Sequence, residues 1–114
     1  MRKILAVDDD DDILDCMAML LEFEGDVRLA RSGVEALAAL EDDVPDVLLL
    51  DLMMPEMSGS ELLDILKELP ERRPRHVIIV SASHDVERTA ASYSTDFLAK
   101  PFDVEKLLEK VRAA

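Results

Sequence analysis

The amino-acid sequence predicts an α/β domain in which a doubly wound, five-stranded parallel sheet lies between two layers of helices. Short apolar runs alternate five times with segments of helical periodicity, and such alternation is typical of parallel strands joined by right-handed crossovers. Apart from Lys3, three of the runs, at 3–7, 47–50 and 77–80, are continuously apolar, as strands buried on both faces are. With 114 residues the chain has room for one core, and we expect residues 1–114 to form one domain.

The first half of the chain predicts strand, helix, strand and helix in turn. After the run at 3–7, a set of apolar residues lies at helical spacing, and Gly25 ends the pattern as a C-terminal cap would. The members of that set are Ile13, Leu14, Met17, Leu20 and Leu21. Residues 26–30 alternate like an outer strand, and Ser32-x-x-Glu35 is a capping box that opens the second helix.

The second half of the chain repeats this alternation. Ser58-x-x-Glu61 is another capping box. Residues 84–92 are expected to form a helix, although one valine and a few alanines are all that give it an inner face. Residues 97–99 indicate a last strand, and Asp103 is expected to cap the final helix.

Composition and charge exclude several classes of protein. The formal net charge is −13, so we expect this domain to bind no nucleic acid, because that binding relies on Lys and Arg displacing counterions. No apolar run reaches the ~18 residues of a membrane-spanning helix, and aspartates 8–12 cut short a stretch that would otherwise resemble a signal peptide. The one cysteine, Cys16, is expected to be a small core residue in a reducing compartment. We therefore expect a cytoplasmic domain with no membrane partner.

Polar side chains follow four of the five expected strands. They are, in chain order, Asp8 and Asp9, Asp51, Ser81 and Lys100. Open α/β sheets bind ligands beyond the carboxyl ends of their strands, at the point where the strand order reverses. The order 2-1-3-4-5 is a known doubly wound arrangement, and in it these four strands are neighbours. The polar residues would then converge on one cleft.

Such a cleft favours phosphoryl-transfer chemistry. Three uncompensated carboxylates would raise one another's pKa, and a hard divalent cation such as Mg²⁺ removes the conflict. A lysine is a poor metal ligand but binds a phosphate oxygen well, and a serine hydroxyl can donate to another. Metal, lysine and hydroxyl around one carboxylate make a site in which the carboxylate can be the nucleophile.

Four sequence blocks resemble the signatures of two-component response regulator receiver domains, in the same order and at the same spacing. They read KILAVDDD at 3–10, LDLMMPEMSG at 50–59, VSA at 80–82 and KPF at 100–102. The resemblance covers essentially the whole chain. It implies a flavodoxin-like three-layer sandwich and a domain that takes a phosphoryl group from a histidine kinase.

The resemblance also implies a role for each acidic residue of the cleft. Asp51 resembles the phosphoacceptor, which forms an acyl phosphate. Asp9 resembles a direct Mg²⁺ ligand and Asp8 a partner that acts largely through water, while Asp51 itself and the backbone carbonyl of Met53 complete the protein ligands. The implied cofactor is Mg²⁺.

The remaining roles concern phosphoryl binding and switching. Lys100 resembles the lysine that pairs with the phosphoryl group, and its peptide bond to Pro101 is expected to be cis. Ser81 resembles the switch hydroxyl, with Ala82 beside it at the phosphoryl group, and Phe97 stands where the family has an aromatic rotamer switch. The domain would phosphorylate itself and slowly dephosphorylate itself, without being an enzyme otherwise.

The chain departs from the family pattern at several positions. Phe97 has no hydroxyl where Tyr is more usual, so its signal would be carried by packing alone. Tyr93-Ser94 replaces the usual Gly-Ala pair, which puts the local turn and the shape of the output face in doubt. Met53 and Ser83 lie where the family lines the path of the hydrolytic water. Apolar Met53 cannot orient that water, and we hypothesise that this prolongs the phosphorylated state.

Simpler interpretations apply to some of these residues. Aspartates 10–12 are better explained as helix-start residues favoured by the helix dipole than as metal ligands. Ser81 could instead be a helix cap. Met53, Met54 and Met57 are expected to pack the loop after the phosphoacceptor.

Three other functions are compatible with parts of the sequence. A haloacid-dehalogenase-type phosphatase shares Asp8-x-Asp10 but needs Thr or Val where this chain has Asp12. A flavodoxin-like electron carrier would need a hydroxyl- and glycine-rich phosphate loop in place of the aspartates. A degenerate receiver could act as a binding module without phosphorylation.

The expected partners follow from the resemblance. They are a histidine kinase or phosphotransfer protein, and either a downstream protein or an output domain of a longer chain. The face formed by residues 84–112 is a possible homodimer surface.

Overall fold

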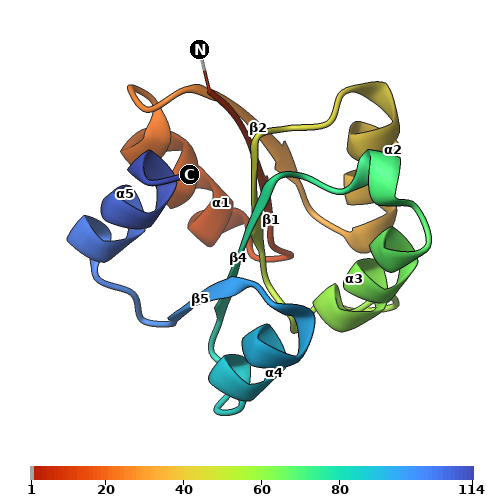
Figure 1. The fold of residues 1–114 in the computed structure, drawn as a ribbon. Helices are drawn as coiled ribbons and strands as arrows, with labels where there is room; N and C mark the ends of the chain where they lie inside the picture. The colour runs from red at the N-terminus through yellow and green to blue at the C-terminus, as the bar shows by residue number, and fades with distance from the viewer. Residues whose placement is uncertain (1) are drawn as a thin grey trace.

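The computed structural model describes residues 2–114 and confirms the predicted fold class. Five parallel strands form one sheet in the order β2-β1-β3-β4-β5, with helices on both faces (Figure 1). The strands are β1 (Lys3–Val7), β2 (Asp26–Ala30), β3 (Val47–Leu50), β4 (His76–Ser81) and β5 (Asp96–Ala99). The helices are α1 (Asp11–Leu21), α2 (Gly33–Asp42), α3 (Gly59–Lys67), the 3₁₀ turn η1 (Pro70–Arg72), α4 (Val86–Tyr93) and α5 (Val104–Arg112).

Two apolar layers enclose the sheet, because alternate residues of each strand point to opposite faces. On β1, Leu5 and Val7 pack into one layer, while Ile4 and Ala6 pack into the other. The first layer lies beneath α2, α3 and α4, and the second lies beneath α1 and α5 (Figure 1). All of β3 is buried, as a central parallel strand covered on both faces must be.

Three helices begin directly after the capping residues that the sequence predicted. The hydroxyl oxygens of Ser32 and Ser58 each accept a hydrogen bond from the backbone N–H three residues on, and the carboxylate of Asp103 caps α5. The Asp10 carboxylate caps α1 in the same way, and the first turn of that helix is acidic. The aspartates expected to start α1 therefore do so, in the orientation that the helix dipole favours.

Two expectations for α1 are wrong. The helix ends at Leu21, so Gly25 does not cap it. Gly25 is instead required by a close backbone approach, since a Cβ there would lie 2.2 Å from the carbonyl oxygen of Arg2. Cys16 is exposed rather than in the core, because Met17 beside it takes the inner stripe of the helix.

The helices of this fold are short. The longest, α1, has 11 residues, whereas a bilayer requires about 20. Within residues 2–114, none of the helices combines the length and the apolar character needed to cross a membrane.

The turn between α4 and β5 forms without glycine. Ser94 adopts the left-handed conformation (φ 56°, ψ 44°), and its N–H donates to the carbonyl of Ala91 at 3.2 Å. The N–H of Thr95 donates to the carbonyl of Ala90 at 2.9 Å, which closes the helix. A side chain in this conformation costs roughly 1–2 kcal/mol, so the turn stores local strain.

Replacement of Ser94 by Gly should therefore stabilise the domain. We expect Ser94→Gly to raise the free energy of unfolding by about 0.5–1 kcal/mol, because the relief of the left-handed strain exceeds the extra entropy of an unfolded glycine. Ser92→Gly, two residues earlier in the helix, should lower it by a similar amount. Urea denaturation gives the free energy of unfolding of both variants. A lower value for Ser94→Gly than for the wild type would contradict the claim that Ser94 is strained.

Candidate functional site

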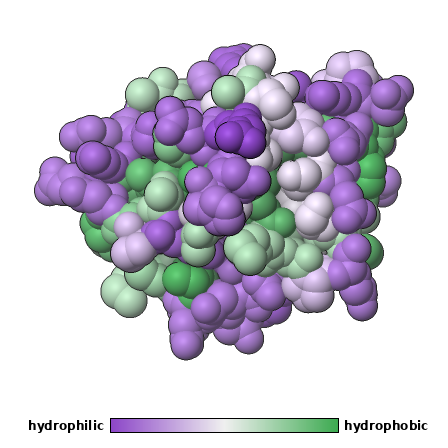
Figure 2. Space-filling model, turned by 90° about the horizontal axis from the view of Figure 1, so that it is seen from below, coloured by the Kyte–Doolittle hydropathy of each residue, from purple (hydrophilic) through white to green (hydrophobic). Residues whose placement is uncertain are grey.

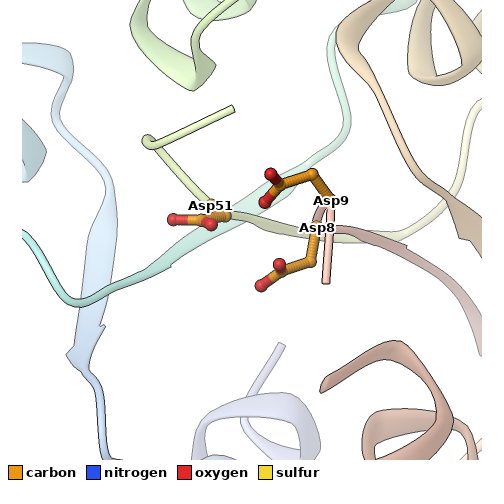
Figure 3. Close-up of side chains that lie close together, drawn as sticks. All are labelled: Asp8, Asp9 and Asp51. Carbon is orange, nitrogen blue, oxygen red and sulfur yellow. The ribbon is translucent and has the colours of Figure 1, made fainter. Parts of the chain in front are cut away.

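Three aspartates meet at the carboxyl ends of β1 and β3. Asp8 and Asp9 directly follow β1, and Asp51 directly follows β3, with its backbone N–H donating to the carbonyl of Val7 at 3.0 Å. One carboxylate oxygen from each aspartate lies within 4.8 Å of the other two. Figure 3 shows the three side chains gathered around one spot between the two strand ends. The sheet order thus brings together residues that lie more than forty positions apart in the chain.

These carboxylates differ in their access to water. Asp8 is 1% exposed and Asp51 is 5% exposed, whereas Asp9 is exposed. Figure 2 shows the end of the molecule at the bottom of Figure 1, to which the strands run, and hydrophilic side chains lie across its centre and along much of its rim, with hydrophobic patches between them. The cluster therefore has two buried members and one that opens it to solvent.

Lys100 provides positive charge at the cluster. It follows β5, and its backbone N–H donates to the carbonyl of Ser81 at 2.9 Å. Its Nζ donates to Asp8 Oδ2 at 2.6 Å and to Asp51 Oδ2 at 3.4 Å. Burial acts to lower the pKa of Lys100, but the two carboxylates outweigh it and raise the pKa above its ordinary value. The peptide bond between Lys100 and Pro101 is cis.

The pKa of Asp51 is raised above its ordinary value, and the main cause is burial. The N–H of Met53 and the ammonium group of Lys100 oppose the rise, as does the Ser81 hydroxyl, while the charge of Asp8 adds to it. One ammonium group thus leaves the cluster with excess negative charge. Three carboxylates with such an excess are the hard oxygen donors that a divalent cation of the Mg²⁺ type accepts, so the residues present fit this metal.

A hydrogen-bonded turn of the same type orients each of three predicted site residues, Asp8, Asp51 and Ser81. The N–H of Asp10 donates to Asp8 Oδ1 at 2.9 Å, and the N–H of Met53 donates to Asp51 Oδ1 at 3.1 Å. At the end of β4, the N–H two residues on donates to the Ser81 Oγ at 3.3 Å. Each side chain therefore accepts a hydrogen bond from the backbone two residues later. These contacts were not predicted, although Asp and Ser at strand ends are the residue types that make them.

Ser81 is fully buried and Ala82 after it is exposed. Because α4 begins only at Val86, Ser81 does not cap that helix. Phe97 on β5 is half-buried and packs in the same apolar layer as Ala90 of α4. The segment that leads into α4 thus begins directly after Ser81, and Phe97 shares an apolar layer with the helix itself.

The methionines of the loop after Asp51 do not all pack as expected. Met54 is buried, and Met57 packs against Gly33 of α2, where a Cβ would lie 2.5 Å from the Met57 sulfur. Met53 is 60% exposed. The expectation that Met53 packs the loop is wrong, because its backbone is held at the carboxylate of Asp51 while its side chain points outward.

Comparison with known proteins agrees with this geometry. The family model described as "Response regulator receiver domain" matches residues 4–112. The chain is 38% identical over 115 residues to response regulator MprA of Mycobacterium leprae, covering 97% of this chain and 50% of that protein. It is 40% identical over 117 residues to transcriptional regulatory protein CpxR of Klebsiella pneumoniae, covering 99% of this chain and 49% of that protein. The chain thus spans about half the length of these relatives.

Solved structures give the same result. The receiver domain of the Francisella response regulator 1452 superposes with a TM-score of 0.87 at 33% identity, covering 99% of this chain and 95% of that one. Response regulator TrrA from Thermotoga maritima, solved in complex with Mg²⁺ and BeF, superposes with a TM-score of 0.86 at 28% identity, covering 99% and 98%. The chain belongs to the receiver domain family of two-component response regulators, whose signalling is controlled by phosphorylation.

Proposed function

We propose that residues 1–114 form one phosphoacceptor domain, in which Asp51 accepts a phosphoryl group from a histidine kinase or a phosphotransfer protein. The observation that carries this proposal is the contact of Lys100 Nζ with the carboxylates of Asp8 and Asp51, inside a cluster of three aspartates. This arrangement combines a nucleophile, a cation for phosphate oxygens and a set of metal ligands.

The transfer would use the residues as follows. An Asp51 carboxylate oxygen attacks the phosphorus of the partner's phosphohistidine, so an O–P bond forms while the P–N bond breaks, and the imidazole leaves with the electron pair. The Lys100 ammonium, which lies 3.4 Å from Asp51 Oδ2, binds one phosphoryl oxygen. The Ser81 hydroxyl and the backbone beside Ala82 bind the others.

Mg²⁺ would be held by Asp8, Asp9, Asp51 and the backbone carbonyl of Met53. Bound there, it would neutralise the charge between the carboxylates and the incoming phosphoryl group. Asp9 is the exposed member of the set and leaves the metal accessible from solvent. Asp8, which bonds to Lys100, would act largely through water.

Switching would begin with the new charge on Asp51, roughly −1.5 to −2. Ser81 and Lys100 would move toward the phosphoryl oxygens, and Phe97 would follow into the space that Ser81 leaves. The packing of Phe97 with α4 supports this route to the surface. The domain would phosphorylate itself from small donors and slowly lose the group, and it would act as a signalling module rather than an enzyme.

The signal would pass to a protein partner or to an output domain of a longer chain. The face formed by residues 84–112 is our candidate for a homodimer surface, since a groove runs along it between β5 and α5. Its lining includes Phe97, Pro101, Lys106, Glu109 and Lys110. With a net charge of −13, this domain is not expected to bind nucleic acid itself. Its single cysteine suits the cytoplasm.

Phosphorylation by a small donor tests the proposal directly. With phosphoramidate and Mg²⁺, the wild-type domain should gain one phosphoryl group by intact-mass spectrometry, and EDTA should prevent the gain. Asp51→Asn should gain none, whereas Asp12→Asn, which alters an exposed aspartate of α1, should behave as wild type. Equal labelling of Asp51→Asn would exclude Asp51 as the acceptor.

The raised pKa of Asp51 predicts a pH-dependent stability difference. A carboxyl group whose pKa is higher in the folded than in the unfolded state stabilises the fold below the unfolded pKa, and this contribution is lost as pH rises through the folded pKa. Near neutral pH in EDTA, Asp51→Asn should therefore have a higher Tm than wild type. The difference should shrink at acidic pH and on addition of Mg²⁺. Asp15→Asn on the exposed face of α1 is the control, and a Tm of Asp51→Asn below that of wild type would refute the prediction.

The exposed Met53 side chain predicts a long-lived phosphorylated state. Met53→Asn should shorten the half-life of the acyl phosphate several-fold, because an amide can orient an attacking water that a thioether cannot. Met19→Asn, an equally polar change at a 69% exposed position of α1, should leave the half-life unchanged. Loss of label in a chase after donor removal gives both values, and similar half-lives in the two variants would remove the hypothesis.

A further inference from the structure

Helix α4 buries little apolar surface of its own. It has eight residues, and only Val86 and Ala90 are buried. Asp85 at its N-cap makes no side-chain capping hydrogen bond. Two small apolar side chains hold a helix weakly, so other contacts must fix its position.

Tyr93, the last residue of α4, provides such contacts to α3. Its hydroxyl donates to Asp64 Oδ1 at 2.7 Å and lies 3.3 Å from the carbonyl oxygen of Ser60. The Nζ of Lys67, one turn along α3, lies 4.6 Å from the centre of the tyrosine ring. The hydrogen bond to Asp64 raises the pKa of Tyr93 to about 12, so the hydroxyl remains a donor at neutral pH.

The backbone of Tyr93 is bound as well. Arg73, in the loop after η1, donates from Nη2 to the Tyr93 carbonyl oxygen at 3.3 Å. Hydroxyl, ring and carbonyl of one residue therefore contact α3 and the loop that follows it. We call this set of contacts, made by Tyr93 with Asp64, Lys67 and Arg73, the Tyr93 latch.

The latch lies in the path of the proposed switch. Helix α4 is joined to β4 by the loop that begins after Ser81, and Tyr93 packs in the same apolar layer as Phe97. Movement of Ser81 and Phe97 that shifts α4 must break the bond to Asp64 or distort it. A contact made in one of two conformations stabilises that conformation and opposes the change to the other.

We propose that the Tyr93 latch holds α4 in its unphosphorylated position and thereby restrains activation. The inference rests on the proposed function of Asp51. The latch depends on a tyrosine at the position where the family usually has glycine, so it belongs to this chain's own sequence. Tyr93 and Asp64 act as positioning residues, through α4, and touch neither the metal ligands nor the phosphoryl group.

Beryllofluoride with Mg²⁺ serves as the probe of the activated state. Removal of the hydroxyl in Tyr93→Phe should tighten apparent beryllofluoride binding about fivefold, the order expected from one net hydrogen bond. Asp64→Ala, which removes the acceptor, should tighten it similarly, and the double variant should do so no further than either single one. Asp15→Ala, at an exposed position of α1, is the matched control and should bind as wild type. Binding is followed by NMR, and hydrogen exchange of residues 86–93 should be faster in both latch variants before the probe is added.

Tyr93 also reports on itself, because the chain has one Tyr and no Trp. A carboxylate acceptor quenches phenol fluorescence, so wild-type emission should rise when beryllofluoride breaks the latch. Unchanged emission together with unchanged affinity of both variants would overturn the latch while leaving the proposed function intact. A wild-type domain that does not respond to beryllofluoride by NMR would instead refute the proposed function, and the latch with it.

Discussion

Asp8 and Asp51 are ionisable groups almost removed from water, and the ammonium group of Lys100 reaches both. Charges in such surroundings are tolerated only when they are paired. One lysine offsets part of the charge of three carboxylates, and the raised pKa of Asp51 reflects the remainder. The excess negative charge therefore favours a bound cation. The proposed phosphoryl group would add further negative charge, so it would depend on that cation and on Lys100.

The strand order of the sheet produces this excess of negative charge. Parallel strands in the order β2-β1-β3-β4-β5 bring the ends of β1 and β3 side by side, with β4 and β5 next to them. Two apolar layers fix the register, because a slip of one residue would exchange the sides of every strand residue. The same layer that buries one face of the sheet also holds α4 and Phe97. The site and the surface that would report its state are thus connected through this apolar layer.

Much of this could be predicted from the sequence. Apolar runs indicated β1, β3 and β4, and polar residues directly follow β1, β3 and β5. Given the strand order, the convergence of Asp8, Asp51 and Lys100 could therefore be expected. Capping side chains such as Ser32 were also identified, because a cap is a local motif.

Contacts between residues that are far apart in the sequence could not be predicted. Gly25 matched a helix cap in pattern, but its actual role depends on the backbone of Arg2, which lies on another segment. Cys16 lies one position away from the buried stripe of α1, a difference that residue type does not reveal. The bond from Tyr93 to Asp64 joins residues 29 positions apart, and no periodicity indicates such a pair.

The hydrogen bonds from residues 10 and 53 to the carboxylates of Asp8 and Asp51 have one more consequence. They close small rings whose size depends on the single methylene of an aspartate side chain. A glutamate at position 51 would carry its charge one carbon further out, away from the N–H of Met53 and into the space proposed for the phosphoryl group. Asp51→Glu would therefore alter the unphosphorylated site as well, and would not simply imitate the charge of the proposed phosphorylated state.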